Sequence, residues 1–322
     1  MTALGEKLRK FDFQTYGSLF AFVVLFVLSA IASPYFTKPE NLLNILRQVS
    51  YTGIIALGMT LVIIGGGIDL SVGSMAAFVG AMSVVVINWL LTVQQNESLA
   101  IAGGALAAIL MGTAAGAANG FLVTRGRIAP FIVTLGTMAI FRSLTLYIGQ
   151  AGEFRSESDS LGELGMAGLW VIPVPVLVMF AMAAVLSVLL NSTRYGRYVF
   201  AVGSNARVAL YSAIGVERTR FWTYTIIGIC VGVSAFLLAS RFNSISSSNA
   251  GQGFELDAIA AVIVGGTAMT GGRGTVWGTI VGAIILGMIN NMLNLLSVSP
   301  YLQGTVRGLI IIGAVWIQRQ RQ

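Results

Sequence analysis

The stretch IIGGGIDLSVGS, residues 63–74, places three consecutive glycines and Asp69 between two apolar runs. The runs, residues 44–64 and 71–91, each have about the 20 residues that an α-helix needs to cross a bilayer. Glycine at this density interrupts a helix, and non-helical backbone at membrane depth is tolerated only inside the protein or along a wet cavity. This stretch therefore predicts membrane helices that are broken within the bilayer.

A second glycine-rich interruption lies in the other half of the chain. It reads VGGTAMTGGRGTVWG over residues 264–278. Two such breaks in opposite halves are similar to the paired broken helices of transporters that are built from repeats. The alternative is that the glycines only allow neighbouring helices to pack closely, and it stays open for most of the 39 glycines.

The composition agrees with a membrane protein. Of 322 residues, 56% are hydrophobic and only 10% are charged, whereas soluble domains have about 25% charged residues. The mean hydropathy is +0.85. No stretch outside the apolar runs is long enough for a separate globular domain, so residues 1–322 are expected to form one all-α polytopic membrane domain.

The apolar runs predict ten membrane spans with both termini in the cytoplasm. Basic residues favour the cytoplasmic side of a membrane protein, so the net charge of +7 indicates orientation and not nucleic-acid binding. The loop 191–220 carries five arginines and one glutamate, whereas the loop 150–167 has Glu153, Glu157, Asp159 and Glu163. Lys7, Arg9, Lys10, Arg319 and Arg321 place the two ends on the side of the loop 191–220. The predicted spans are 17–36, 44–64, 71–91, 99–123, 129–149, 168–190, 221–241, 255–269, 276–297 and 301–318.

Polar side chains inside these spans are the candidates for a translocation pathway: Asp69, Asn290 and Asn294. Asn290 and Asn294 are four residues apart and share one helical face, which suits a hydroxyl-rich solute. The competing interpretation is hydrogen bonding between helices, often worth only ~0.6 kcal/mol. Glu255 and Asp257 begin a predicted span, where acids complement the helix macrodipole.

Several enzyme and metal motifs are absent from the sequence. There is no histidine, one cysteine, no G-x-x-x-x-G-K-[ST] phosphate loop, no H-E-x-x-H and no G-x-S-x-G. We therefore expect no catalytic residue, no metal site and no cofactor in this chain. A carrier driven by protons or sodium would need carboxylates in its spans, and Asp69 is the strong candidate.

Four long runs carry a family resemblance. They are ALGMTLVIIGGGIDLSVGS (56–74), GRIAPFIVTLGTMAIFRSLT (126–145), TRYGRYVFAVGSNARVALYSAIGV (193–216) and GFELDAIAAVIVGGTAMTGGRGTVWGTIVGAIILGMINNMLNLLSVS (253–299). In order and spacing they resemble the permease subunits of ribose-type ABC sugar importers. The resemblance covers nearly the whole chain and is weakest over the first forty residues and the loop 150–167.

The resemblance implies a type II ABC importer-like permease domain in the bacterial inner membrane. It would form a pathway for ribose or a similar pentose or hexose with a second permease copy or paralogue. A periplasmic or lipoprotein binding protein would deliver the sugar, and cytoplasmic ATPase subunits would hold ATP and magnesium. The ATPase-coupling segment of the family maps onto Gly203, Ser204, Asn205, Ala206, Ala209 and Gly215.

The coupling segment agrees with the position of the loop 191–220 as the major cytoplasmic loop. Asn205 suits a helix N-cap, and the small residues Gly203, Ala206 and Ala209 are expected to let the partner approach closely. Two alternatives to an importer subunit are a secondary carrier that works alone and, from another class, a membrane enzyme or scaffold. Because selectivity in the family resides largely in the binding protein, the sequence does not specify the sugar.

Overall fold

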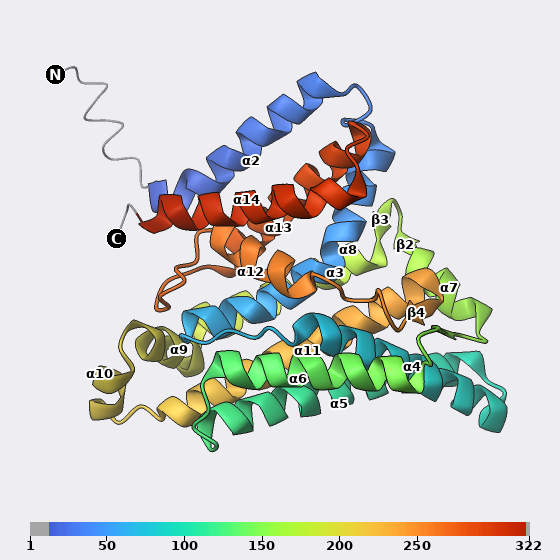
Figure 1. Cartoon of the computed structure of the whole chain (residues 1–322), viewed down its shortest axis with the longest axis horizontal. Helices are drawn as coiled ribbons and strands as arrows, with labels where there is room; N and C mark the ends of the chain where they lie inside the picture. The colour runs from blue at the N-terminus through green and yellow to red at the C-terminus, as the bar shows by residue number, and fades with distance from the viewer. Residues whose placement is uncertain (1–12, 320–322) are drawn as a thin grey trace.

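The protein is a helical bundle in which long apolar helices run between two ends of the molecule (Figure 1). The structure, a computed structural model, describes residues 13–319. Within them, seven helices are long and apolar enough to cross a membrane: α3 (Pro39–Ile64), α4 (Val72–Gln94), α5 (Glu97–Thr124), α6 (Pro130–Ile148), α8 (Val174–Ser192), α11 (Val216–Phe242) and α13 (Val276–Leu295). Large apolar side chains on these helices, such as Phe131 and Ile132 of α6, are exposed as lipid-facing residues would be.

Three further helices coincide with the remaining predicted spans. They are α2 (Phe13–Ala32), α12 (Phe254–Val264) and α14 (Pro300–Arg319). The prediction of a full span over 255–269 is wrong, because α12 has only 11 residues. At ~1.5 Å per residue it is about 16 Å long, roughly half of the ~30 Å hydrocarbon core. The chain leaves α12 at Gly265 and runs without helix to Thr275, as the glycine-rich sequence predicts.

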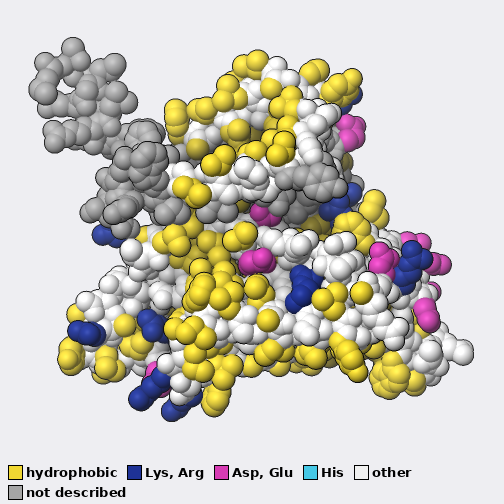
Figure 2. Space-filling model, viewed as in Figure 1, with side chains coloured by type: hydrophobic (Ala, Val, Ile, Leu, Met, Phe, Trp, Pro, Cys, Tyr) yellow, Lys and Arg dark blue, Asp and Glu magenta, His cyan; other side chains and the backbone are white. Residues whose placement is uncertain are grey.

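One end of the bundle carries the short strands. β1 (Glu153–Arg155) pairs antiparallel with β4 (Ser244–Ser246), and helix α7 (Asp159–Met166) lies beside them. The hairpin of β2 (Gly168–Leu169) and β3 (Ile172–Pro173) leads into α8, which therefore begins later than the predicted span 168–190. Acidic side chains gather at this end in Figure 2.

The opposite end carries the loop 191–220, which is mostly helical. It contains α9 (Arg194–Ser204) and α10 (Ala206–Tyr211) before α11 begins. The start of α2 and the end of α14 lie at this same end of the molecule (Figure 1). The predicted basic positions Lys7, Arg9, Lys10 and Arg321 lie outside the described residues.

Among the described residues, helices α5 and α11 share the most extensive helix–helix contact, and glycine makes their approach possible. A Cβ atom on Gly112 or Gly116 of α5 would meet the backbone of α11 at Gly228, and a Cβ atom on Gly232 would meet the backbone of α5. We call these four glycines the glycine seam. At these four positions the alternative that the sequence left open, close helix packing through glycine, is the one observed.

Candidate functional site

The break between α3 and α4 is built around buried Asp69. Its Oδ1 accepts hydrogen bonds from the backbone N–H of Ser71 at 2.8 Å and from the Ser71 hydroxyl at 2.6 Å. Asn119 of α5 donates from Nδ2 to the Ser71 hydroxyl at 2.9 Å, and Tyr224 of α11 donates to the carbonyl of Ile68 at 3.0 Å. Asp69 is fully buried, so its observed contacts hold the break in place.

The C-terminal end of α9 contacts both glycine-rich breaks. A Cβ atom on Gly203 would meet the carbonyl oxygen of Ile64, where α3 ends, and the backbone nitrogen of Gly272 in the second break. The N–H of Gly272 donates to the same Ile64 carbonyl at 2.9 Å. We call the meeting point of Ile64, Gly203 and Gly272 the junction. It connects three segments that are far apart in the sequence.

The junction gives Gly203 close neighbours within the chain, whereas the sequence related its small size to the approach of a partner. The space beside Gly203 is filled by Ile64 and Gly272, and Ala209 is 3% exposed on α10, a helix that contacts α9 and α11. Ser204, Asn205 and Gly215 are exposed, and Ala206 is half-buried. The close approach that Gly203 allows is therefore made within the chain.

Helix α10 begins with the predicted cap. The side-chain oxygen of Asn205 accepts from the N–H groups of Arg207 at 3.0 Å and Val208 at 3.1 Å. This confirms Asn205 as a helix N-cap. The helix and its cap present three large apolar side chains to the surroundings: Val208, Leu210 and Tyr211, which are 58%, 63% and 89% exposed. These three side chains were not among the residues selected from the sequence, although Val208 and Leu210 flank the selected Ala209 and Tyr211 follows directly.

The segment before α12 descends deep into the bundle. Asn88 of α4 bonds to the backbone of Arg155 and Glu157 at the end with the strands. A Cβ atom on Gly80 of α4 would meet Ile245 of β4, and Gly73, seven residues earlier on the same helix, packs against Gly251 and Glu255. Between β4 and α12 the chain therefore descends about 10 Å along α4, at ~1.5 Å per residue.

Two cavities follow this descent. The first, of about 570 Å³, has Glu153, Ser244 and Ser246 at the end with the strands and reaches Gly251 and Phe254. We call it the outer vestibule. The second, of about 200 Å³, lies between α3, α12 and α13, and we call it the inner cavity. Gln48 and Phe254 line both, so the two cavities are neighbours.

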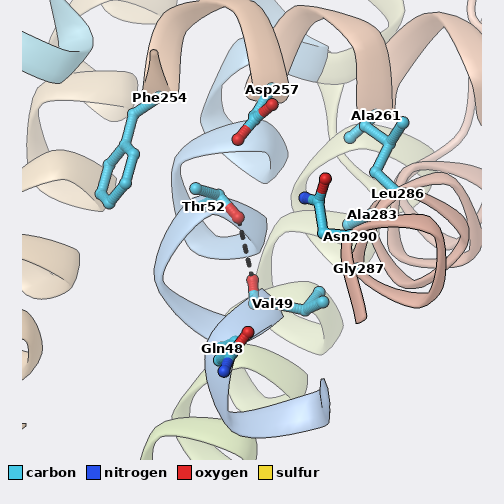
Figure 3. A pocket seen from close by; sticks show the side chains of 10 residues that line it. All are labelled: Gln48, Val49, Thr52, Phe254, Asp257, Ala261, Ala283, Leu286, Gly287 and Asn290. Atoms are coloured by element: carbon cyan, nitrogen blue, oxygen red, sulfur yellow. Dashed lines mark hydrogen bonds between the residues drawn. The ribbon is translucent and has the colours of Figure 1, made fainter. Parts of the chain in front are cut away.

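Polar groups from three helices converge on the inner cavity (Figure 3). Asp257 points from α12 toward Thr52 of α3, and Asn290 reaches in from α13. Glu255 and Asp257 do lie in the first turn of α12, as the sequence predicts. The cavity role of Asp257, Gln48 and Thr52 was missed; the four-residue spacing of Gln48 and Thr52 on α3 was the available signal.

The three predicted pathway residues do not come together. Asn290 lines the inner cavity, whereas Asp69 belongs to the α3–α4 break. Asn294 is exposed and accepts a hydrogen bond from Gln303 of α14 at 2.8 Å. Its neighbour Asn291 exchanges two hydrogen bonds with Asn41 of α3, at 2.8 and 3.0 Å, and so joins two helices.

Comparisons with known proteins match nearly the whole chain to permease components of transport systems. A family model described as "Branched-chain amino acid transport system / permease component" matches residues 41–315. The ribose import permease of Bacillus subtilis (strain 168) is 39% identical over 310 residues, which are 96% of this chain and 94% of that protein. The D-allose transport system permease of Escherichia coli (strain K12) is 37% identical, covering 94% of this chain and 91% of its own.

A third relative has a different printed substrate. The L-arabinose transport system permease of Escherichia coli (strain K12) is 36% identical over 95% of this chain and 91% of its own length. No solved structure gives a significant match to this chain.

Proposed function

Because this chain belongs to the family of transport-system permease components, we propose that it is the transmembrane subunit of an ATP-driven importer of a monosaccharide. The observation that carries the substrate class is the similarity, over nearly the full length, to permeases named for ribose, D-allose and L-arabinose. Members of this family are transport components, so the chain is a permease and not an enzyme.

The proposed route for energy coupling starts at α10. A cytoplasmic ATPase subunit, which carries ATP and magnesium, would receive the exposed side chains Val208, Leu210 and Tyr211 in a surface groove, as amphipathic helices dock in other complexes. Ser204, Asn205, Ala206 and Gly215 lie at the edges of this surface. Movement of α9 and α10 would then reach α3 and the second break through the junction, where Gly203 abuts both.

The proposed route for the sugar runs through the outer vestibule toward the inner cavity. Asn290 supports this proposal by lining the inner cavity. Asp69 and Asn294 stay predictions as gating residues. Their contacts suit a gate better than a lining, since Asp69 fixes the α3–α4 break and Asn294 ties α13 to α14.

The proposed orientation puts α9, α10 and both termini in the cytoplasm of a bacterial cell and the strands outside the inner membrane. The concentration of arginine in residues 191–220 supports it. In this arrangement α2, α12 and α14 complete ten membrane segments. The partners are a periplasmic or lipoprotein sugar-binding protein, the ATPase, and a second permease copy or a paralogue.

Reconstitution of the permease with its ATPase and binding protein tests the function. Sugar-loaded binding protein is expected to stimulate ATP hydrolysis and to drive uptake of ribose, D-allose or L-arabinose into vesicles. Ala206→Trp and Asn205→Glu change the α10 edge and are expected to uncouple hydrolysis from loaded binding protein. Uptake that is independent of the ATPase would contradict the proposal and favour a carrier that works alone.

A further inference from the structure

Phe254 lies where the outer vestibule meets the inner cavity. It is the first residue of α12 and follows Gly253, whose positive φ of 78° turns the chain sharply into the helix. Its side chain lines both cavities, together with Gln48 of α3. In Figure 3 the ring of Phe254 and the carboxylate of Asp257 leave the same end of α12 toward α3. A solute that moves from one cavity to the other passes this ring.

The lining of the inner cavity selects a class of ligand. Asp257 offers a carboxylate, Gln48 and Asn290 offer amides that both donate and accept, and Thr52 offers a hydroxyl. The rest of the lining is apolar: Val49, Phe254, Ala261, Ala283, Leu286 and Gly287. The carboxylate disfavours an anion, and the mixture of amides with an aromatic ring matches the hydroxyls and C–H faces of a neutral polyol.

The size of the inner cavity agrees with a small ligand. Its volume of about 200 Å³ is below the ~300–1,000 Å³ that is usual for sites of drug-sized ligands. A monosaccharide therefore fits this scale better than a disaccharide. The inner cavity also lies deeper than the strands, because α12 begins near the level of Gly73, about two helical turns along α4 from the contact of Gly80 with Ile245 of β4.

Resting on the proposed function, we propose that the inner cavity is a monosaccharide-binding site of the permease itself. Asp257, Asn290 and Gln48 bind the sugar hydroxyls there, and the ring of Phe254 separates the site from the outer vestibule. The sugar would dwell at this site after it leaves the binding protein.

Asp257 also has a simpler explanation, because acids in the first turn of a helix complement the macrodipole. Glu255 shares that property, since it lies in the same first turn. Its carboxylate, however, is directed at Gly73 of α4, and it lines neither of the two cavities. Glu255→Gln is thus a matched control for Asp257→Asn: both remove one first-turn charge, and only the second alters the cavity.

The test uses the full complex in lipid nanodiscs without ATP. Cys230, the only cysteine, is replaced by alanine, and Thr52→Cys introduces a thiol that lines the inner cavity. The rate at which a small methanethiosulfonate reagent modifies this thiol is measured with ribose, D-allose, L-arabinose or sucrose. At a sugar concentration ten times a ~1 mM dissociation constant, labelling should slow about tenfold.

The expected result is protection by at least one of the three monosaccharides and none by sucrose. Asp257→Asn should abolish the protection and Glu255→Gln should preserve it, while Phe254→Ala should speed labelling several-fold in the absence of sugar. If protection by sugar is lost equally in Asp257→Asn and Glu255→Gln, Asp257 acts only as a helix-terminal charge. If the labelling rate is unchanged in Phe254→Ala, the ring of Phe254 is not a barrier between the two cavities.

Stimulation of the ATPase by loaded binding protein, measured on the same nanodiscs after ATP is added, keeps the two proposals separate. If stimulation is present and no monosaccharide slows labelling, the importer stands and the inner cavity is not a sugar site. If no sugar-loaded binding protein stimulates hydrolysis, the proposed function itself fails.

Discussion

The glycine seam and the junction both bring backbones into close contact, yet they join different kinds of partner. The seam lies between α5 and α11, which pack along much of their length. The junction joins the ends of segments, with Gly203 of α9 against Ile64 and Gly272. Long side-by-side packing holds two helices as one body, whereas an end-to-end contact passes a displacement from one body to the next. We infer that the seam resists movement and the junction transmits it.

The largest effect is expected from Gly203→Ala. The new Cβ atom would overlap two backbones that no side-chain rotation can clear, and overpacking costs about 1–3 kcal/mol or more. Loss of the junction should lower uptake about tenfold or more in vesicles containing the complete importer. Gly304→Ala on α14 is the control, because a Cβ atom there has no neighbour within 4 Å and the residue lies outside the coupling segment. Equal uptake by the two variants would remove the junction from the coupling route.

A stability effect without specific uncoupling is expected from Gly116→Ala in the seam. The added methyl group would meet the Tyr224 carbonyl and the backbone of Gly228, at a cost of about 1–3 kcal/mol. The thermal midpoint of the purified complex should fall, and the remaining folded fraction should couple hydrolysis to transport normally. Gly136→Ala on α6 is the matched control, since a Cβ atom there has no neighbour within 4 Å. A folded Gly116→Ala complex that hydrolyses ATP without transport would assign transmission to the seam as well.

Asp69 tests what holds the α3–α4 break next to the junction. Asp69→Asn keeps the acceptor for the Ser71 N–H and hydroxyl, so uptake and thermal midpoint should stay near those of the unaltered protein. Asp69→Ala removes that acceptor from a fully buried network and should cost about 1–3 kcal/mol. Loss of uptake in a stable Asp69→Asn protein would show that the charge itself is needed, as a carrier coupled to an ion gradient requires.

The smallest effect on sugar uptake is expected from Asn294→Leu, which tests whether the contact between α13 and α14 takes part in the movement. It removes the exposed hydrogen bond to Gln303, worth about 0.5–1.5 kcal/mol at most. Uptake should decrease slightly, while Asn290→Leu in the inner cavity should lower it strongly with the complex still assembled. A larger loss in Asn294→Leu than in Asn290→Leu would move the critical polar group to the contact between α13 and α14.

Local signals predicted much of this fold. Apolar runs located the long helices, glycine density located both breaks, and the residue type of Asn205 predicted its role as a helix N-cap. These features depend on neighbours within a few residues. The arrangement at Gly203 was not predictable in this way, because Ile64 and Gly272 reach it only through the tertiary fold.

The inner cavity was partly predictable for a similar reason. Asn290 stood out as an amide in an apolar run, whereas Asp257 looked like an ordinary helix-terminal acid. Only the packing of the segment before α12 makes that helix terminus part of a cavity wall. A serine- and glycine-rich stretch such as 243–253 is typical of a surface loop, and its position inside the bundle follows from the packing of Gly251 against Gly73.

Docking of α10 on the ATPase subunit can be tested by photo-crosslinking of the assembled importer from two exposed tyrosine positions. Tyr211 ends α10 and is 89% exposed, and Tyr147 lies near the end of α6 and is 82% exposed. With benzoylphenylalanine at position 211 we expect a covalent adduct with the ATPase subunit, and at position 147 we expect none. An ATPase adduct from position 147, or its absence from position 211 in a complex that still transports sugar, would rule out α10 as the docking helix.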